Sequence, residues 1–345
     1  MLSSAHSVDQ SPIIPRTGPQ VNWKQALAAA FRDWPEFLDY LQLSPQQLNF
    51  SLAAQQQFKL IVPRHYAEQI RKGDPQDSLL RQVAPLSDEL QQHAGFSHNP
   101  VADLESIEHP GLLHKYHGRV LLMVSGGCAI HCRYCFRRHF PYQEHQLDDD
   151  RMQQGLNYIA ADPSITEVIL SGGDPLLLSD KALQQLLEKL ASIHHLKRIR
   201  IHSRIPLVLP ERMTNKLADV LCSTRLRSVL VIHANHPNEL SVFNQQRLLS
   251  FHQKDIVLLN QSVLLKGVNN KTRILAHLSE KLFDCHVMPY YLHTLDKVNG
   301  AAHFDLPSST IAELYNDLRA QLPGYLLPKL VREVSGMPGK LPFTG

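Results

Sequence analysis

The sequence has few cysteines, no long apolar run and little excess charge, and each shortage excludes a class of protein. Five cysteines in 345 residues show no disulfide framework, so we expect a reducing, cytoplasmic setting. No run approaches the ~18 consecutive apolar residues of a membrane-spanning helix. A formal charge of +3 is too balanced to indicate a nucleic-acid or membrane surface. The first residues also lack the basic and apolar regions of a secretory signal.

Two regions that differ in composition and in hydrophobic pattern follow one another along the chain. Residues 1–20 are rich in Ser, Pro and Gln, a composition typical of a mobile terminus. Residues 23–101 predict short helices interrupted by prolines, with an apolar face in 34–43 at Trp34, Phe37, Leu38 and Leu41. From Arg119 onward, short apolar runs alternate with amphipathic stretches. We therefore predict an N-terminal helical segment over residues 1–109 and an α/β unit over residues 110–345.

Six apolar runs in the second region predict β-strands, and amphipathic helices lie between and after them. The predicted strands cover 120–124, 168–170, 199–202, 229–232, 256–259 and 286–289. The predicted helices cover 150–161, 180–193, 211–223, 239–254, 272–283 and 308–321. Repeated strand–helix alternation is typical of a parallel sheet with crossover helices. The fold class is therefore α/β, a complete or partial barrel of the TIM type.

Polar residues follow each predicted strand, where barrels of this kind carry their chemistry. In chain order they are the cysteine loop 128–135, the turn 171–175 (SGGDP), 202–204 (HSR), 233–237 (HANHP), 260–262 (NQS), and then His293, Asp296 and Lys297. One face of the predicted barrel thus collects Cys, His, Asp and Arg. We expect the functional site on that face.

Cys128, Cys132 and Cys135 form a C-x3-C-x2-C run. Three thiolates on one short loop can hold three irons of a [4Fe–4S] cluster and leave the fourth iron open to a small molecule, whereas most such clusters are closed by a fourth cysteine. A zinc site is the alternative, with His131 or His139 as the fourth ligand. Structural zinc loops normally take two of their ligands from a distant segment, and the remaining two cysteines are isolated, which favours the cluster.

Three further features suggest a site, although each also has an ordinary explanation. The turn Gly172–Gly173–Asp174 lets a ligand approach the backbone closely, but such residues also dominate simple turns. Arg137 follows the cysteine loop and can bind a carboxylate with two hydrogen bonds, or it can be structural. Lys340 follows a Gly- and Pro-rich loop and can bind pyridoxal phosphate (PLP) covalently, or it can be a solvated lysine.

Together these motifs resemble the lysine 2,3-aminomutase family of radical S-adenosylmethionine (SAM) enzymes. The resemblance covers about residues 110–340. The blocks that carry it, in the family's order and spacing, are CAIHCRYCFRRHF, SGGDP, HSRIPLVLP, HANHPNE, NQSVLLKGVN and MPYYLHTLDKVNGAAHF. The cysteine spacing alone marks radical SAM enzymes broadly, and the later blocks are more specific. The resemblance implies an open barrel of six β/α units and three cofactors, the [4Fe–4S] cluster, SAM and PLP.

The resemblance also implies roles for individual residues. Cys128, Cys132 and Cys135 would bind the cluster, and Gly172, Gly173, Asp174, His233 and Gln261 would bind SAM. Lys340 would bind PLP covalently, with Lys115, Tyr116 and Arg119 around its phosphate. Arg137 would bind the substrate carboxylate, and Asp296 and Glu333 its ε-ammonium. Three positions depart from the family: Lys115 replaces Arg, Glu333 replaces Asp, and His293 stands where Tyr is frequent.

The implied reaction moves the α-amino group of L-lysine to C3 and gives (R)-β-lysine. The migrating nitrogen must be a free amine, and Arg137 would bind a free carboxylate. The predicted substrate is therefore free lysine. The chain stops five residues after Lys340, without the C-terminal extension of longer family members. This feature and the segment 23–43 most resemble members that serve elongation factor P and its lysyl ligase. The alternative is a radical SAM enzyme without PLP that modifies a protein or an RNA.

Overall fold

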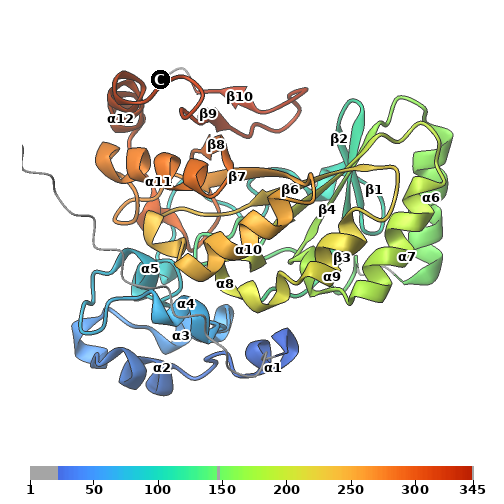
Figure 1. The fold of residues 1–345 in the computed structure, drawn as a ribbon. Helices are drawn as coiled ribbons and strands as arrows, with labels where there is room; N and C mark the ends of the chain where they lie inside the picture. The colour runs from blue at the N-terminus through green and yellow to red at the C-terminus, as the bar shows by residue number, and fades with distance from the viewer. Residues whose placement is uncertain (1–21, 146–147, 344–345) are drawn as a thin grey trace, which may run out of the picture.

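The computed structural model describes residues 22–145 and 148–343 (Figure 1). Residues 1–20, expected to be a mobile terminus, therefore lie outside the described part, as does the very end of the chain. The N-terminal segment is built of short helices, as predicted. They are α1 (Trp23–Ala28), α2 (Trp34–Leu41), α3 (Leu52–Gln57), α4 (Arg64–Glu68) and α5 (Ser78–Arg81), with 3-10 turns between them.

Local signals explain these short helices. The Asp33 side chain accepts a hydrogen bond from the Glu36 N–H and caps α2, and a proline stands in the first turn, where a missing N–H costs nothing. The apolar face of α2 is buried as predicted, at Trp34, Phe37, Leu38 and Leu41. Pro63 stands at the N-cap position of α4, so the prolines begin helices here as well as separating them.

A ten-stranded sheet forms the rest of the fold, with its strands in sequence order. The strands are β1 (Ile107–His109), β2 (Leu112–Tyr116), β3 (Arg119–Ser125), β4 (Glu167–Gly172), β5 (Arg198–Ser203), β6 (Arg227–Ile232), β7 (Val257–Val263), β8 (Met288–His293), β9 (Lys329–Arg332) and β10 (Leu341–Pro342). Strands β3 to β9 are parallel, and antiparallel strands flank them at both edges. Within the described chain β1 and β10 each pair with one strand only, so the barrel stays open.

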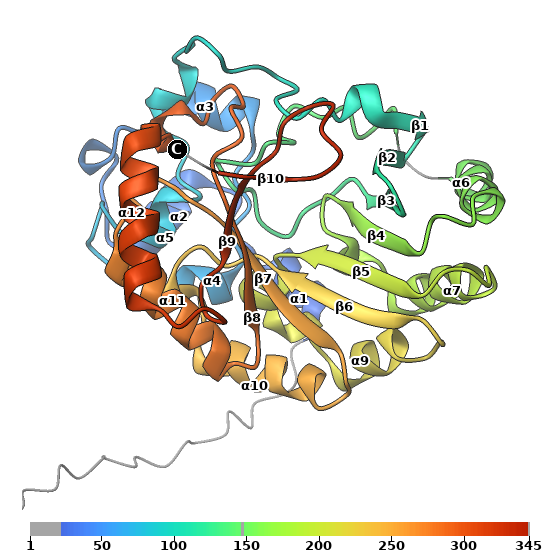
Figure 2. The same ribbon diagram turned by 90° about the horizontal axis from the view of Figure 1, so that it is seen from above.

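Helices cover the outer side of this curved sheet, as Figure 2 shows from above. They are α6 (Asp149–Ala161), α7 (Asp180–Ala191), α8 (Ile205–Val208), α9 (Asn215–Leu221), α10 (Val242–His252), α11 (Thr272–Asp284) and α12 (Ser308–Gln321). Side chains of Ser179, Thr214 and Ser241 cap α7, α9 and α10. The predicted partial barrel is confirmed, and each of the six predicted strands overlaps one of β3 to β8.

Two strand predictions were wrong at their ends. The prediction stopped one strand at residue 259, but β7 continues to Val263; its buried residues Asn260 and Ser262 are polar and hydrogen-bonded, so a pattern of apolar residues could not reveal the end of the strand. The prediction began the last strand at 286, but His286 has a positive φ of 59° and ends the preceding helix turn, so β8 begins at Met288. The sequence prediction also missed the edge strands β1, β2, β9 and β10, which are short.

The helical segment and the barrel share one hydrophobic core. Phe31, Trp34 and Tyr66 belong to the same buried cluster as Leu122 and Ile201 of the barrel strands. The predicted boundary at residue 109 remains a prediction, and β1 lies on its N-terminal side. None of the helices in the described ranges is both long and apolar enough to span a membrane.

Candidate active site

The three predicted cluster cysteines lie on the loop after β3, and their thiols are free. The Sγ of Cys132 accepts a hydrogen bond from the Arg204 guanidinium at 2.6 Å. Burial, followed by the nearby Cys132, raises the pKa of the Cys135 thiol to about 11. Thiolates in this loop therefore need compensating positive charge, which bound iron would supply.

A cluster and a single zinc ion place different demands on these three thiols. In the described residues, no three His, Cys, Asp or Glu side chains are gathered so as to hold one metal ion. Tetrahedral zinc requires all its ligands within about 2.3 Å of one centre. A cubane instead takes each thiolate on a different iron, so its sulfur ligands stay apart. The described residues thus show no assembled site for the zinc alternative with His131 or His139. His131 Nδ1 in addition hydrogen-bonds the Lys59 carbonyl.

The SGGDP turn packs directly on the cysteine loop. Gly172 has a φ of 112°, and Gly173 donates a backbone hydrogen bond to Ser125 O at 2.7 Å. A Cβ on Gly173 would lie 2.0 Å from Gly127 O. The glycines are therefore required for close approach between two backbones, whether or not a ligand is bound. Any group held by the turn would lie beside the cysteines.

Asp174 holds this turn in place with its side chain. Its carboxylate accepts hydrogen bonds from Ser203 Oγ at 2.8 Å and from the backbone N–H groups of Arg204 and Ile205 at 2.8 and 3.1 Å. Burial raises the pKa of Asp174 to about 6 against these bonds. Its carboxylate thus fixes the loop after β5, and contact with SAM through this residue remains a prediction.

His233 and Gln261, both predicted to assist SAM, lie near each other at the ends of β6 and β7. The Nε2 of His233 and the Tyr134 hydroxyl are 2.8 Å apart. Burial, and then the Arg204 charge, lowers the pKa of His233 to about 3, so the ring is neutral. A backbone hydrogen bond with Gln261 opposes that shift.

A continuous line of ion pairs joins the predicted PLP and substrate residues. Lys340 Nζ donates to Glu333 Oε2 at 2.7 Å, and Lys115 Nζ lies 3.2 Å from Glu333 Oε1. Lys115 also pairs with Asp103 Oδ1 at 2.6 Å, and Arg137 Nε pairs with Asp103 Oδ2 at 2.7 Å. Five charged residues from four separate segments thus form one network.

The basic residues of this network lower the pKa values of its two acids, Glu333 and Asp103. Burial opposes ionisation of Glu333, but Lys340 and Lys115 outweigh it and lower its pKa to about 2. Arg137 and then Lys115 likewise outweigh burial and hold the pKa of Asp103 below its usual value. Both carboxylates are therefore ionised, and they offset two of the three positive charges of Lys340, Lys115 and Arg137.

The predicted phosphate-binding residues lie at the same place, on β2 and β3. Arg119 stacks over the Tyr116 ring with its guanidinium carbon 4.7 Å from the ring centroid. Burial and then Glu333 raise the pKa of Tyr116, so its hydroxyl stays protonated. With Lys115, these residues supply two cations and a hydroxyl next to Lys340, a donor set that fits the phosphate of PLP.

Asp296 and His293 complete the predicted set. Burial raises the pKa of Asp296 to about 7, although the Lys340 charge opposes this. His293 is the last residue of β8 rather than lying beyond it, and its ring is buried. Burial and then Lys340 lower its pKa well below the usual value. The positive charge of Lys340 thus lowers the pKa of both groups.

The sequence prediction missed three residues of this site. Asp103 precedes the recognised motifs, and nothing in its neighbourhood distinguishes it. Ser171 Oγ accepts a hydrogen bond from Arg137 Nη1 at 3.2 Å. Arg204 lies in the HSR block noted in the sequence, but its contact with a cysteine could not be inferred from spacing.

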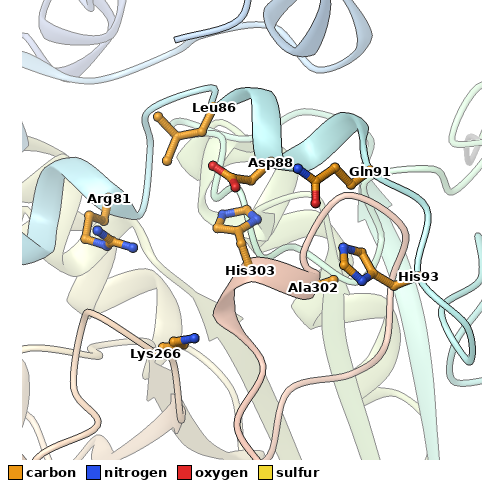
Figure 3. Close-up of a pocket in the computed structure, with 8 residues that line it drawn as sticks. All are labelled: Arg81, Leu86, Asp88, Gln91, His93, Lys266, Ala302 and His303. Atoms are coloured by element: carbon orange, nitrogen blue, oxygen red, sulfur yellow. The ribbon is translucent and has the colours of Figure 1, made fainter. Parts of the chain in front are cut away.

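A cavity of about 400 Å³ lies apart from these residues (Figure 3). It opens between the helical segment and the loops after β7 and β8. Its lining residues are Arg81, Leu86, Asp88, Gln91, His93, Lys266, Ala302 and His303. None of them was a predicted site residue, and none bears the cysteine, PLP or substrate groups. The candidate site and this cavity are therefore separate.

Similarity to known proteins agrees with this geometry. Residues 122–240 match the radical SAM superfamily. The chain is 46% identical over 328 residues to L-lysine 2,3-aminomutase of Escherichia coli, covering 95% of this chain and 96% of that one. The chain belongs to the lysine 2,3-aminomutase family of radical SAM enzymes. It is thus an isomerase of the aminomutase type, and the family implies a [4Fe–4S] cluster and SAM.

Other family members differ in how much of them the chain spans. The L-lysine 2,3-aminomutase of Haemophilus influenzae is 44% identical, with 96% of this chain and 97% of that protein covered. The enzyme of that name from Clostridium subterminale is 32% identical, with 93% of this chain and 77% of that protein covered.

A solved radical SAM methyltransferase from Sphaerobacter thermophilus aligns at 17% identity and a TM-score of 0.42, covering 64% of this chain and 68% of that one.

Proposed function

We propose that this enzyme converts free L-lysine into (R)-β-lysine and that it requires PLP as well as the cluster and SAM. One observation supports this most directly: a single network joins Lys340, Glu333, Lys115 and Arg137. When bound, the cluster and SAM supply a carbon radical, and PLP supplies a carrier for the migrating amino group. The protein residues supply orientation and charge.

Recognition of the two ends of lysine follows from the charges. Arg137 is held by Asp103 and Ser171, so its guanidinium is oriented before the substrate arrives. At the other end, Glu333 already accepts a hydrogen bond from a lysine ε-ammonium, that of Lys340. The same carboxylate suits the ε-ammonium of a substrate once Lys340 carries PLP. Asp296, a second buried acid, would share that charge.

Exclusion of water is the other task of these residues. Lys115, Asp103 and Glu333 have side chains with 15%, 4% and 15% of their surface exposed. Ionic interactions in such a site are stronger than in water. A bound amino acid would therefore be held by charge at both ends while its carbon chain lies between them. A lysine within a peptide lacks the free carboxylate and free amine that this arrangement addresses.

Anaerobic incubation of reconstituted protein with SAM, PLP, dithionite and L-lysine tests the proposal. Chiral chromatography should detect (R)-β-lysine, and omission of PLP should abolish its formation. The matched control uses Nα-acetyl-lysine, which should give no product. Product formed equally well after PLP is removed would favour the alternative of a radical SAM enzyme without PLP.

We further propose that the (R)-β-lysine serves the modification of elongation factor P by its lysyl ligase, in the cytoplasm. The supporting observations are the sequence resemblance of segment 23–43 and five free cysteines, which suit a reducing compartment. Mass spectrometry of elongation factor P incubated anaerobically with its ligase, ATP, this enzyme, SAM, PLP, dithionite and L-lysine tests the link. Because the two lysines are isomers, each adds the same mass, so the proposal predicts a larger modified fraction or a faster modification than with the ligase and L-lysine alone, and equal modification would contradict it.

A further inference from the structure

A buried arginine contacts one of the three cluster cysteines. Arg204 directly follows β5, and its Nη1 lies 2.6 Å from Cys132 Sγ. The other end of the same guanidinium, Nη2, donates to Glu239 Oε2 at 2.9 Å. The side chain of Glu239 is fully buried. Arg204 thus lies between a metal-binding sulfur and a buried carboxylate.

Several groups fix this guanidinium. Gln82 Oε1 accepts from Nη2 at 2.8 Å, and the Tyr66 hydroxyl lies 3.3 Å from the same nitrogen. The guanidinium carbon is 5.6 Å from the centroid of the Tyr134 ring. The backbone N–H of Arg204 donates to Asp174, which anchors it to the SGGDP turn. Since Gln82 and Tyr66 belong to the helical segment, that segment forms part of the surroundings of the cluster.

We propose that Arg204 raises the reduction potential of the cluster, so that an external one-electron reductant such as dithionite can reduce it; the same shift lowers the driving force for the later electron transfer to SAM. Hydrogen bonds to ligand sulfurs and net charge are among the main determinants of iron–sulfur potentials. An N–H donor and a fixed positive charge both stabilise the extra electron of the reduced cluster. Glu239 lowers the reduction potential, because its negative charge disfavours the extra electron. The Arg204–Glu239 pair therefore determines the net charge beside the cluster.

No other arginine of the loop has this relationship in the described structure. Arg133 and Arg138, which flank Cys135, both direct their guanidinium groups to Glu89. Both arginines thus share the single carboxylate of Glu89 as their ion-pair partner. Arg204 is the residue whose guanidinium donates to a cysteine sulfur within the described chain. The inference depends on the cluster alone and does not rest on PLP or lysine.

The experiment measures the midpoint potential of the reconstituted cluster by electron paramagnetic resonance, without SAM. In Arg204→Lys the positive charge stays but the donor to sulfur is lost. We expect the ratio of reduced to oxidised cluster at a fixed potential to fall about tenfold, the effect of one charge-assisted hydrogen bond, or about 59 mV for one electron. Glu239→Gln removes the opposing charge and should shift the potential upward.

Arg212→Lys is the matched control. Arg212 is buried like Arg204, with 0% against 7% of its surface exposed, but it bonds Asp180 and the backbone carbonyls of Leu176 and Leu178. Four irons per chain in each protein must be verified first, and their absence from the wild type would refute the cluster itself. An unchanged potential in Arg204→Lys, or the same shift in Arg212→Lys, would overturn the proposal. Should Arg204→Lys fail to fold, Glu239→Gln decides, because an unchanged or lower potential there overturns it.

Discussion

Lys340 and Glu333 form a hydrogen-bonded ion pair of 2.7 Å. One is the predicted attachment point of PLP and the other the predicted partner of the substrate ε-ammonium. Because of this pairing, the carboxylate that would bind the substrate already has a lysine of the protein as its partner. Covalent attachment of PLP to Lys340 would remove that competitor. Lysine should therefore bind after PLP.

The first prediction concerns Lys340 itself. Lys340→Ala should show no visible absorbance from lysine-bound PLP and should lose at least ~10³-fold of its aminomutase activity, because the covalent carrier has no attachment point. Lys329→Ala is the control, since Lys329 is exposed on β9 and should match the wild type. Wild-type absorbance in Lys340→Ala would assign PLP to another lysine.

Asp103→Asn should weaken the binding of both anionic groups. Asp103 orients Lys115 and Arg137 with its two oxygens, and loss of a buried charged hydrogen bond costs about 1.5–3 kcal/mol. We expect the PLP dissociation constant and the KM for lysine to rise about 10- to 100-fold, with a smaller change in kcat. Absorbance titration and steady-state kinetics measure these quantities. A fall in kcat with both affinities unchanged would show that Asp103 has another role.

Asp296 should impose a pH dependence. Burial raises its pKa to about 7, and only the ionised carboxylate attracts the ε-ammonium of lysine. Protonation increases as the pH falls through 7, so kcat/KM should decrease on the acid side, up to tenfold per pH unit. Asp296→Asn should have a lower kcat/KM at pH ~8 and no inflection near 7. If the variant kept the inflection, another group would be responsible.

Gly173→Ala should disrupt the cysteine loop. A Cβ there would lie 2.0 Å from Gly127 O, a backbone atom that cannot move alone. We expect a loss of about 1–3 kcal/mol in the free energy of unfolding and a lower iron content after reconstitution. Gly324→Ala is the matched control, because an added Cβ meets nothing within 4 Å. Equal iron content and stability in both variants would contradict the proposed packing.

Much of the fold was predictable because its signals are local. Apolar runs such as 120–124 and capped helices such as α7 carry their own periodicity, and their alternation indicates parallel strands. Strand ends failed for physical reasons: the last residues of β7 include the polar Asn260 and Ser262, which are buried and hydrogen-bonded, and the positive φ of His286 delays the start of β8. The short edge strands, β1 and β10, contain too few residues to show a pattern.

The site was predictable where a motif carried it and not elsewhere. The cysteines, Arg137 and Lys340 stand in recognisable blocks, and the structure brings Arg137 and Lys340 into one network. Asp103 became visible only in three dimensions, because it reaches the network from the segment before β1. The same holds for Arg204, whose contact with Cys132 joins positions 72 residues apart.

The most direct test of the central claim follows the migrating nitrogen. L-lysine labelled with ¹⁵N at the α-amino group is incubated anaerobically with the reconstituted enzyme, SAM, PLP and dithionite in the presence of excess unlabelled ammonium. If the enzyme moves the amino group within one molecule, nuclear magnetic resonance will show ¹⁵N bonded to C3 of β-lysine at undiminished enrichment. Unlabelled nitrogen at C3, or no β-lysine at all, would contradict it.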